Sequence, residues 1–155
     1  MKLILSNLVL LTLFLGSCKT TSQTFTASTP IEQLAVELFE VIKKKDFNAF
    51  EKLMAKDMKI EKHQRATDDY TNSNTETTRK IFDSFYEKNI DWKNVKIKKV
   101  SSSMRGTEIL KHAQVTINFN NKTNSCTLFF PNWLKPENES WKIGGLPPEL
   151  NCLSK

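Results

Sequence analysis

The spacing of apolar residues changes once along this 155-residue chain, and that change limits the folds open to it. In residues 31–42 apolar side chains recur every three or four positions, as on one buried helical stripe. In residues 113–119 they alternate with polar side chains, which indicates a β-strand with one face in water. Helical segments come first and strands second. The sequence therefore predicts an α+β domain with an antiparallel sheet.

Helix-start signals predict three helices in the first half of the chain. The first begins after Thr29, an N-cap that Glu32 can complete as a capping box. Asp46 is expected to cap a second, short helix, and a third should begin at Ser73, where Glu76 forms another capping box. The helical phenylalanines are assigned to packing rather than to a ligand site: Phe39, Phe47, Phe50, Phe82 and Phe85.

Strands are expected mainly in the second half. Residues 125–130 should pair with the alternating strand as an antiparallel hairpin, and a last strand is expected over residues 140–144. The prolines at 147–148 remove two backbone donors, so the tail after them is not expected to extend the sheet. Earlier in the chain, residues 58–61 fit a short strand and residues 62–74 a long polar loop.

Two segments resemble a known superfamily. Residues 31–54 form an amphipathic helix, a break at an acidic residue in Lys-Lys-Asp-Phe-Asn-Ala-Phe-Glu-Lys-Leu, and a second helix. This opening resembles the nuclear transport factor two-like, or ketosteroid isomerase-like (SnoaL-like), cone fold, and the closing Trp-Lys-Ile at residues 141–143 is similar to its last strand. The resemblance implies N-terminal helices on a curved antiparallel sheet, cystatin-like in outline, around a conical cavity. Members use the cavity for catalysis, binding or assembly, so the fold fixes no activity.

The N-terminus resembles a bacterial lipoprotein signal peptide. Lys2 precedes an apolar run at residues 3–15, and a Leu-Gly-Ser-Cys tetrapeptide, the lipobox, ends at Cys18. The run is shorter than the roughly 17 to 25 residues that a membrane-spanning helix needs. The resemblance implies that residues 1–17 are removed, that Cys18 is acylated, and that the exported chain is anchored in a bacterial membrane. The outer membrane, on its periplasmic or surface side, is the expected site. An ordinary secretory signal with a chance cysteine is the alternative.

Composition divides the rest into a tether and a domain. Residues 18–28 are rich in hydroxyl groups and lack apolar periodicity, as expected of a flexible tether, and residues 29–155 should form a single domain. The formal net charge is +6, but basic residues are not interleaved with aromatic ones, so no nucleic-acid partner is expected. The lysine clusters at residues 43–45 and 96–99 suit anionic lipid headgroups or envelope polymers, or simply a solvated surface.

Two cysteines remain once Cys18 is assigned to the lipid. In an oxidising envelope, Cys126 and Cys152 are expected to form a disulfide rather than two free thiols. Neither belongs to a Cys-x-x-Cys motif, and His63 and His112 have no metal-ligand spacing, so no metal or other cofactor is expected.

A few residues are candidates for a catalytic site. An enzyme of the cone-fold family needs a general base on the cavity floor and a hydrogen-bond donor for the developing oxyanion. His63, Asp69 and Tyr70 lie in one polar stretch and could supply them, with Arg105 and His112 further on. A surface loop is the simpler interpretation of that stretch. The alternative function is thus a small cavity enzyme of isomerase or dehydratase type.

The favoured function is non-catalytic binding by an envelope lipoprotein. Besides the lipid bilayer that acylated Cys18 would enter, the expected partner is a small apolar ligand or an envelope protein. Phe129 and Trp133 follow a strand into a proline-containing segment, and exposed aromatic side chains there would form a partner-binding lip. The alternative for both residues is a hydrophobic plug at the open end of the cone.

The lipobox yields a direct prediction. Replacing Cys18 by Ala should abolish lipidation and release the protein from the membrane fraction wherever the signal is still cleaved. Mass spectrometry of the wild-type protein and of the Cys18→Ala variant, after membrane fractionation, measures both effects. A wild-type chain that carries no acyl group, or that retains its first 17 residues, would contradict the assignment.

Overall fold

The computed structural model describes residues 25–56, 74–106, 110–122, 124–136 and 139–153. In these residues the elements follow one another as α1 (Pro30–Lys44), α2 (Phe47–Leu53), α4 (Thr75–Glu87), the short 3-10 helix η1 (Trp92–Asn94), β1 (Lys96–Gly106), β2 (Leu110–Asn121), β3 (Asn124–Pro136), β4 (Lys142–Ile143) and β5 (Glu149–Leu153). Helices precede strands and the strands pair antiparallel, so the predicted α+β class is confirmed. The expected strand at 58–61 lies outside the described residues.

The start of α1 is fixed by the predicted capping box. The Glu32 N–H donates to Thr29 Oγ1 over 3.2 Å, and the Thr29 N–H donates to Glu32 Oε2 over 3.0 Å. Ser28 adds two hydrogen bonds to the same carboxylate, from its N–H and its hydroxyl. These bonds, the Ser28 hydroxyl first, hold the pKa of Glu32 below its usual value. The last residue of the expected tether is therefore attached to the helix.

The second and third helices differ in how well their caps were predicted. Asp46 Oδ1 accepts from the Ala49 N–H over 2.9 Å, as expected. The predicted start of the third helix at Ser73 is wrong by one residue, because Asn74 is the N-cap and its side chain accepts from the Thr77 N–H over 2.7 Å. Asparagine caps a helix as well as serine does, so local propensity does not separate the two positions.

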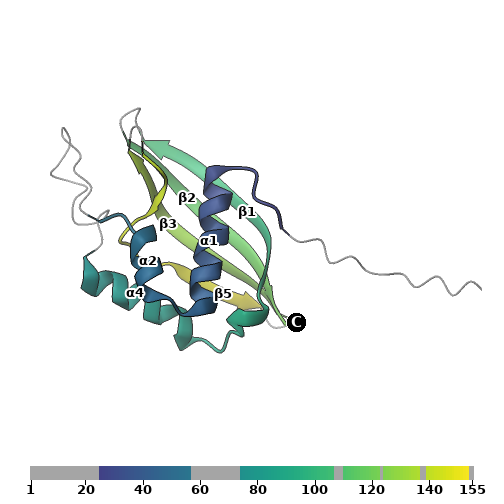
Figure 1. The fold of residues 1–155 in the computed structure, drawn as a ribbon. Coiled ribbons are helices and arrows are strands. Elements are labelled where there is room, and N and C mark those ends of the chain that lie inside the picture. The colour runs from purple at the N-terminus through teal and green to yellow at the C-terminus, as the bar shows by residue number, and fades with distance from the viewer. Residues whose placement is uncertain (1–24, 57–73, 107–109, 123, 137–138, 154–155) are drawn as a thin grey trace, which may run out of the picture.

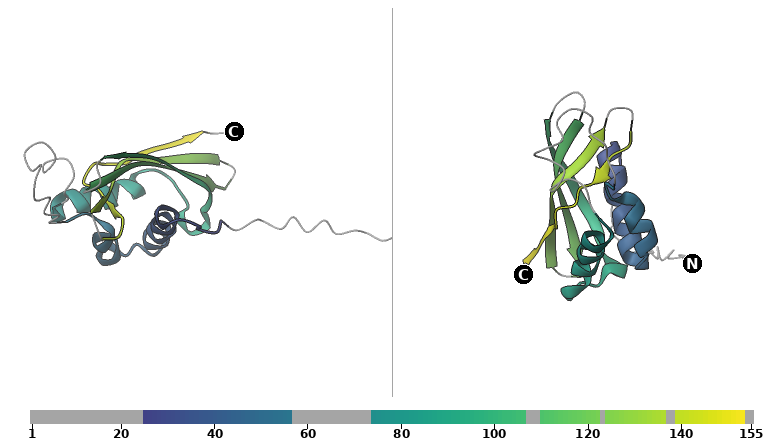
Figure 2. Two further views of the ribbon diagram at one scale, coloured as in Figure 1. Left: turned by 90° about the horizontal axis from the view of Figure 1, so that it is seen from above. Right: turned by 90° about the vertical axis from the view of Figure 1, so that its left-hand side faces the viewer.

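The sheet has the order β1-β2-β3-β4, and β5 pairs with β3. The two short strands share the edge of β3: β4 lies beside residues 133–134 and β5 beside residues 125–129. The expectation that the tail would not extend the sheet is therefore wrong. The prolines at 147–148 precede β5, so their missing donors fall in the connection and not on the ladder. Figures 1 and 2 show α1 and α2 on the same side of the twisted sheet.

A chain of aromatic rings joins the helices to the sheet, and we call its eight members the aromatic chain. Phe39 of α1 lies 5.3 Å from Phe119 of β2 and 5.8 Å from Trp92, between ring centroids, and Trp92 lies 5.6 Å from Phe119. The chain continues from Trp92 to α4 and α2. Its members are Phe39, Phe47, Phe50, Phe82, Phe85, Tyr86, Trp92 and Phe119. The predicted packing role of the helical phenylalanines is thus confirmed.

The buried stripe of α1 predicts a large cost for truncation. Leu38→Ala should lower the free energy of unfolding by about 2 to 5 kcal/mol, since Leu38 is 0% exposed and its loss leaves a cavity. Urea unfolding followed by circular dichroism measures this. The exposed Lys44 of the same helix is the control, and Lys44→Ala should change the free energy by less than about 0.5 kcal/mol. Equal effects of the two substitutions would contradict the packing of α1.

Candidate functional site

The described structure includes two of the five residues considered for catalysis, Arg105 and His112. His63, Asp69 and Tyr70 lie outside the described residues. Arg105 and His112 face each other across β1 and β2 in the sheet register. His112 is half-buried, and its Nδ1 lies 3.1 Å from Asn132 Oδ1. The contact that orients His112 among the described residues is therefore with an amide and not with a carboxylate.

Trp133 is not the exposed residue that a partner-binding lip requires. β3 continues through this stretch, and Trp133 pairs with Ala113 of β2 and with Ile143 of β4. It is 0% exposed and its ring lies 5.5 Å from that of Phe130. Phe129 is half-buried, opposite Thr116 of β2. Trp133 therefore forms no exposed lip, because its side chain belongs to the hydrophobic core.

A surface hollow of about 610 Å³ lies where α1 and α4 end, and we call it the lysine-lined hollow. Its charged residues are Lys43, Lys45, Lys88, Lys93, Glu87 and Asp91. Apolar and polar walls complete it: Ile42, Tyr86, Asn89, Ile90 and Trp92. With four ammonium groups against two carboxylates, the hollow favours an anionic group.

The end of α1 and the face of Tyr86 shape one wall of the hollow. Lys45 terminates α1 in the left-handed backbone region, with φ of 55°, and its Nζ lies 5.2 Å from the centroid of the Tyr86 ring. The Tyr86 hydroxyl donates to the backbone oxygen of Ile42 over 2.8 Å and so ties α4 to α1. Burial, and secondarily the charge of Asp83, raise the pKa of Tyr86 to about 12. Tyr86 is therefore a neutral hydroxyl at physiological pH.

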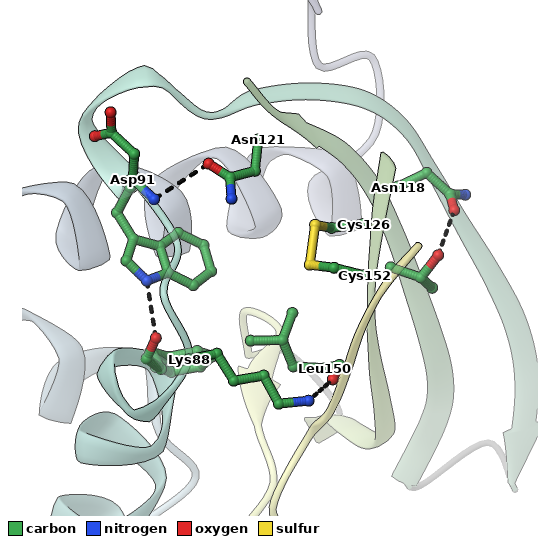
Figure 3. Close-up of a disulfide and its surroundings, with 10 residues drawn as sticks. Lys88, Asp91, Asn118, Asn121, Cys126, Leu150 and Cys152 are labelled. Carbon is green, nitrogen blue, oxygen red and sulfur yellow. Dashed lines mark hydrogen bonds between the residues drawn. A yellow bond between two sulfur atoms is a disulfide. The ribbon is translucent and has the colours of Figure 1, made fainter. Parts of the chain in front are cut away.

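Other residues that line the hollow are held by hydrogen bonds to the sheet and to α4 (Figure 3). Lys88 Nζ donates to the backbone oxygen of Leu150, so α4 holds β5 through its C-cap residue. The Asp91 N–H donates to Asn121 Oδ1 over 3.2 Å at the end of β2. Trp92 Nε1 donates to the Phe85 backbone oxygen over 2.8 Å. The segment that carries these lining residues is thus fixed at both ends.

The expected cysteine pair lies next to these contacts. Cys126 of β3 and Cys152 of β5 are directly opposite in the register, and their sulfur atoms are bonded at 2.04 Å. Cys126 is buried and Cys152 is exposed. The disulfide therefore reinforces an existing strand pairing, rather than holding a tail that has left the sheet.

A second, smaller hollow of about 330 Å³ lies beside the start of α1. Leu34 and Trp141 form its apolar floor, and Glu37 and Lys142 are at its rim. Within the described part of the chain, no three His, Cys, Asp or Glu side chains gather as metal ligands. No helix among the same residues has the length and apolar character to cross a membrane.

Comparisons with known proteins assign no family to this chain. The chain matches no protein-family model, no curated protein and no solved structure at a significant level.

The raised pKa of Tyr86 predicts a pH effect on stability. The unfolded chain ionises this residue near pH 10, whereas the folded protein keeps it protonated to about pH 12. Its contribution to stability is therefore complete below pH 10 and is lost as the pH rises toward 12. Unfolding free energies measured across this window should fall more steeply for the wild type than for Tyr86→Phe. Identical slopes would contradict the burial of the hydroxyl.

Proposed function

We propose that this protein is a bacterial envelope lipoprotein whose domain, of the nuclear transport factor two-like cone type, binds a partner without catalysis. Cys18 at the end of the lipobox would carry the lipid, and the domain would act at the membrane surface. The order of helices followed by an antiparallel sheet supports the cone-type topology. The isomerase or dehydratase alternative depends on His63, Asp69 and Tyr70 and gains no support from the described residues.

The aromatic chain is the observation that carries the proposal. Cone-fold enzymes hold their substrate between the helices and the sheet, and here this space contains the rings of Phe39, Trp92 and Phe119. Successive rings of the chain lie 5.1 to 5.9 Å apart between centroids, which is the spacing of directly packed aromatic side chains. Side chains that fill the interior in this way support recognition at the surface.

We propose that the partner binds in part through an anionic group, and that this group lies in the lysine-lined hollow. Lys43 is paired with Glu40 over 2.9 Å, and Lys88 is bound to a backbone oxygen, so these two lysines already have partners. Lys45 and Lys93 are exposed at the rim. A phosphate or carboxylate group of an envelope component can approach both ammonium groups, while Ile90 offers an apolar contact beside them.

Charge reversal at the rim tests this function. Glycerol 1-phosphate, the headgroup of an anionic phospholipid, should cause saturable NMR shifts in residues 86–93 of the full-length chain in detergent micelles. The double variant Lys45→Glu, Lys93→Glu should weaken binding about tenfold or more, because two attractive charges become repulsive. Lys44→Glu, Lys52→Glu is the matched control, since both side chains are exposed outside the hollow and the net charge changes equally.

Two results would contradict the proposal. Equal weakening in the control variant would mean that net charge alone attracts the probe. Shifts confined to Phe39 and Phe119, which do not line the hollow, would mean that the ligand enters the interior.

A further inference from the structure

The net positive charge of the described residues is concentrated in one stretch. Residues 92–106 and 110–122 contain seven basic residues and no acidic one. The preceding described residues, 25–56 and 74–91, contain eight basic and nine acidic residues, and the described residues after 123 contain two of each. The excess of positive charge therefore belongs to η1, β1, β2 and the turn after β2, and a partner drawn to it must be acidic.

β1 is also an edge of the sheet. Among the described residues it pairs with β2 alone, over a length of 11 residues, so alternate backbone N–H and C=O groups face outward. Natural sheets protect such edges with lysines and bulges. The first residues of β1 have both kinds of protection. They contain three lysines, Lys96, Lys98 and Lys99, and the pairing with β2 is irregular between Ile97 and Lys99.

The protection ends at Lys99. Residues 100–104 have the sequence Val-Ser-Ser-Ser-Met, without charge or proline, and their register with β2 runs without a break. The next charge is at Arg105. The edge therefore presents five uncharged residues between two cations, long enough to pair with one further short strand.

The side chains of this stretch alternate between the two faces of the sheet. Lys99, Ser101, Ser103 and Arg105 share one face, because they pair with the half-buried polar side chains of β2. Val100, Ser102 and Met104 pair with buried residues of β2 and so share the helix-side face. Met104 is 52% exposed there. An added strand would meet apolar side chains on the helix side and two cations on the other.

We propose that residues 100–104 accept an extended peptide segment of a partner protein as an additional strand of the sheet. The segment carries two acidic side chains, one opposite Lys99 and one opposite Arg105. Because Lys99 and Arg105 are six residues apart, both acidic side chains lie on one face of the added strand. Its intervening residues on the other face are apolar and contact Val100 and Met104. This inference goes beyond anion binding in the lysine-lined hollow and uses different residues, so either proposal can fail alone.

Charge argues against the other occupants of this edge. In a second copy paired antiparallel with Ser102 opposite Ser102, Lys99 of each copy would lie opposite Arg105 of the other. Both of these pairs would bring two positive charges together. An anionic membrane would attract the lysines but would leave the backbone groups of the edge unpaired. An acidic extended peptide satisfies both the charges and the backbone.

The test uses the full-length chain in detergent micelles and a synthetic peptide, acetyl-Asp-Val-Thr-Val-Thr-Val-Asp-amide. Its two aspartates are six residues apart, and its valines lie on one face. Binding should slow hydrogen exchange of outward-facing amides within residues 100–104 at peptide concentrations up to about 1 mM. No slowing over that range would overturn the proposal.

Two modified peptides separate strand pairing from simple charge attraction. One is N-methylated at its valines and the other at its threonines, which removes the donors from one edge of the strand or from the other. Only one of these two peptides should lose binding, because an added strand forms its hydrogen bonds to the sheet through one of its two edges. Equal binding of both peptides would show that charge alone holds them and would overturn strand addition.

Protein variants locate the contact. Lys99→Glu, Arg105→Glu should weaken peptide binding about tenfold or more, whereas Lys44→Glu, Lys52→Glu carries the same charge change and should not. Met104→Lys adds an edge-protecting lysine at a half-exposed position and should also weaken binding.

Two other occupants of the edge would be recognised by hydrogen exchange. Exchange at residues 100–104 that slows with protein concentration would identify a second copy. Slowing with phosphatidylglycerol vesicles but not with peptide would identify a lipid surface. Either result would overturn the proposal.

Discussion

Packing of Phe39 against Trp92 and Phe119 is the interaction on which the rest of the structure depends. It places α1 on the sheet, and the rings that continue from Trp92 place the other helices in turn. Phe85 connects Trp92 to α4, and Phe50 of α2 packs against Phe85. Each such ring pair contributes about 0.5 to 1.5 kcal/mol beyond the burial of its area, so the aromatic chain is a large part of what joins these elements.

This packing bears on the binding that we propose. Because the rings of Phe39, Trp92 and Phe119 pack together between the helices and the sheet, we propose recognition at two basic surfaces of the described part of the chain. The lysine-lined hollow lies at the ends of α1 and α4, which the aromatic chain connects through Phe39, Trp92 and Phe85. The edge of β1 lies on the strand that follows Trp92. Both surfaces suit an acidic partner in the envelope that the lipobox predicts.

Local signals in the sequence predicted the local features. Thr29 and Asp46 cap their helices as expected, because a cap depends only on residues within one turn. Of the helical phenylalanines, Phe39, Phe50, Phe82 and Phe85 are buried as their spacing predicts, and Phe47 is partly buried against the core. Ser73 was the wrong cap because its neighbour Asn74 has the same propensity, and one turn of sequence cannot choose between them.

Apart from the Cys126–Cys152 disulfide, which the cysteine count predicts correctly, features that depend on distant parts of the chain were not predictable. Trp133 is buried in a core whose other members come from distant parts of the chain, so the polar and proline residues around it do not predict its position. The prolines at 147–148 suggest that the chain leaves the sheet there, whereas β5 begins after them and pairs with β3. The lysine-lined hollow is assembled from the ends of two helices more than 40 residues apart in sequence, and only the cluster at residues 43–45 hinted at it.

A single NMR measurement tests the filled interior most directly. Nuclear Overhauser effects would be recorded between the labelled aromatic side chains of the full-length protein in the presence of benzene, a small apolar probe. Direct packing predicts strong effects among Phe39, Trp92 and Phe119 and none between these rings and benzene. Effects from benzene to Phe39 or Phe119, with loss of those between the rings, would contradict the account and restore a ligand chamber between the helices and the sheet.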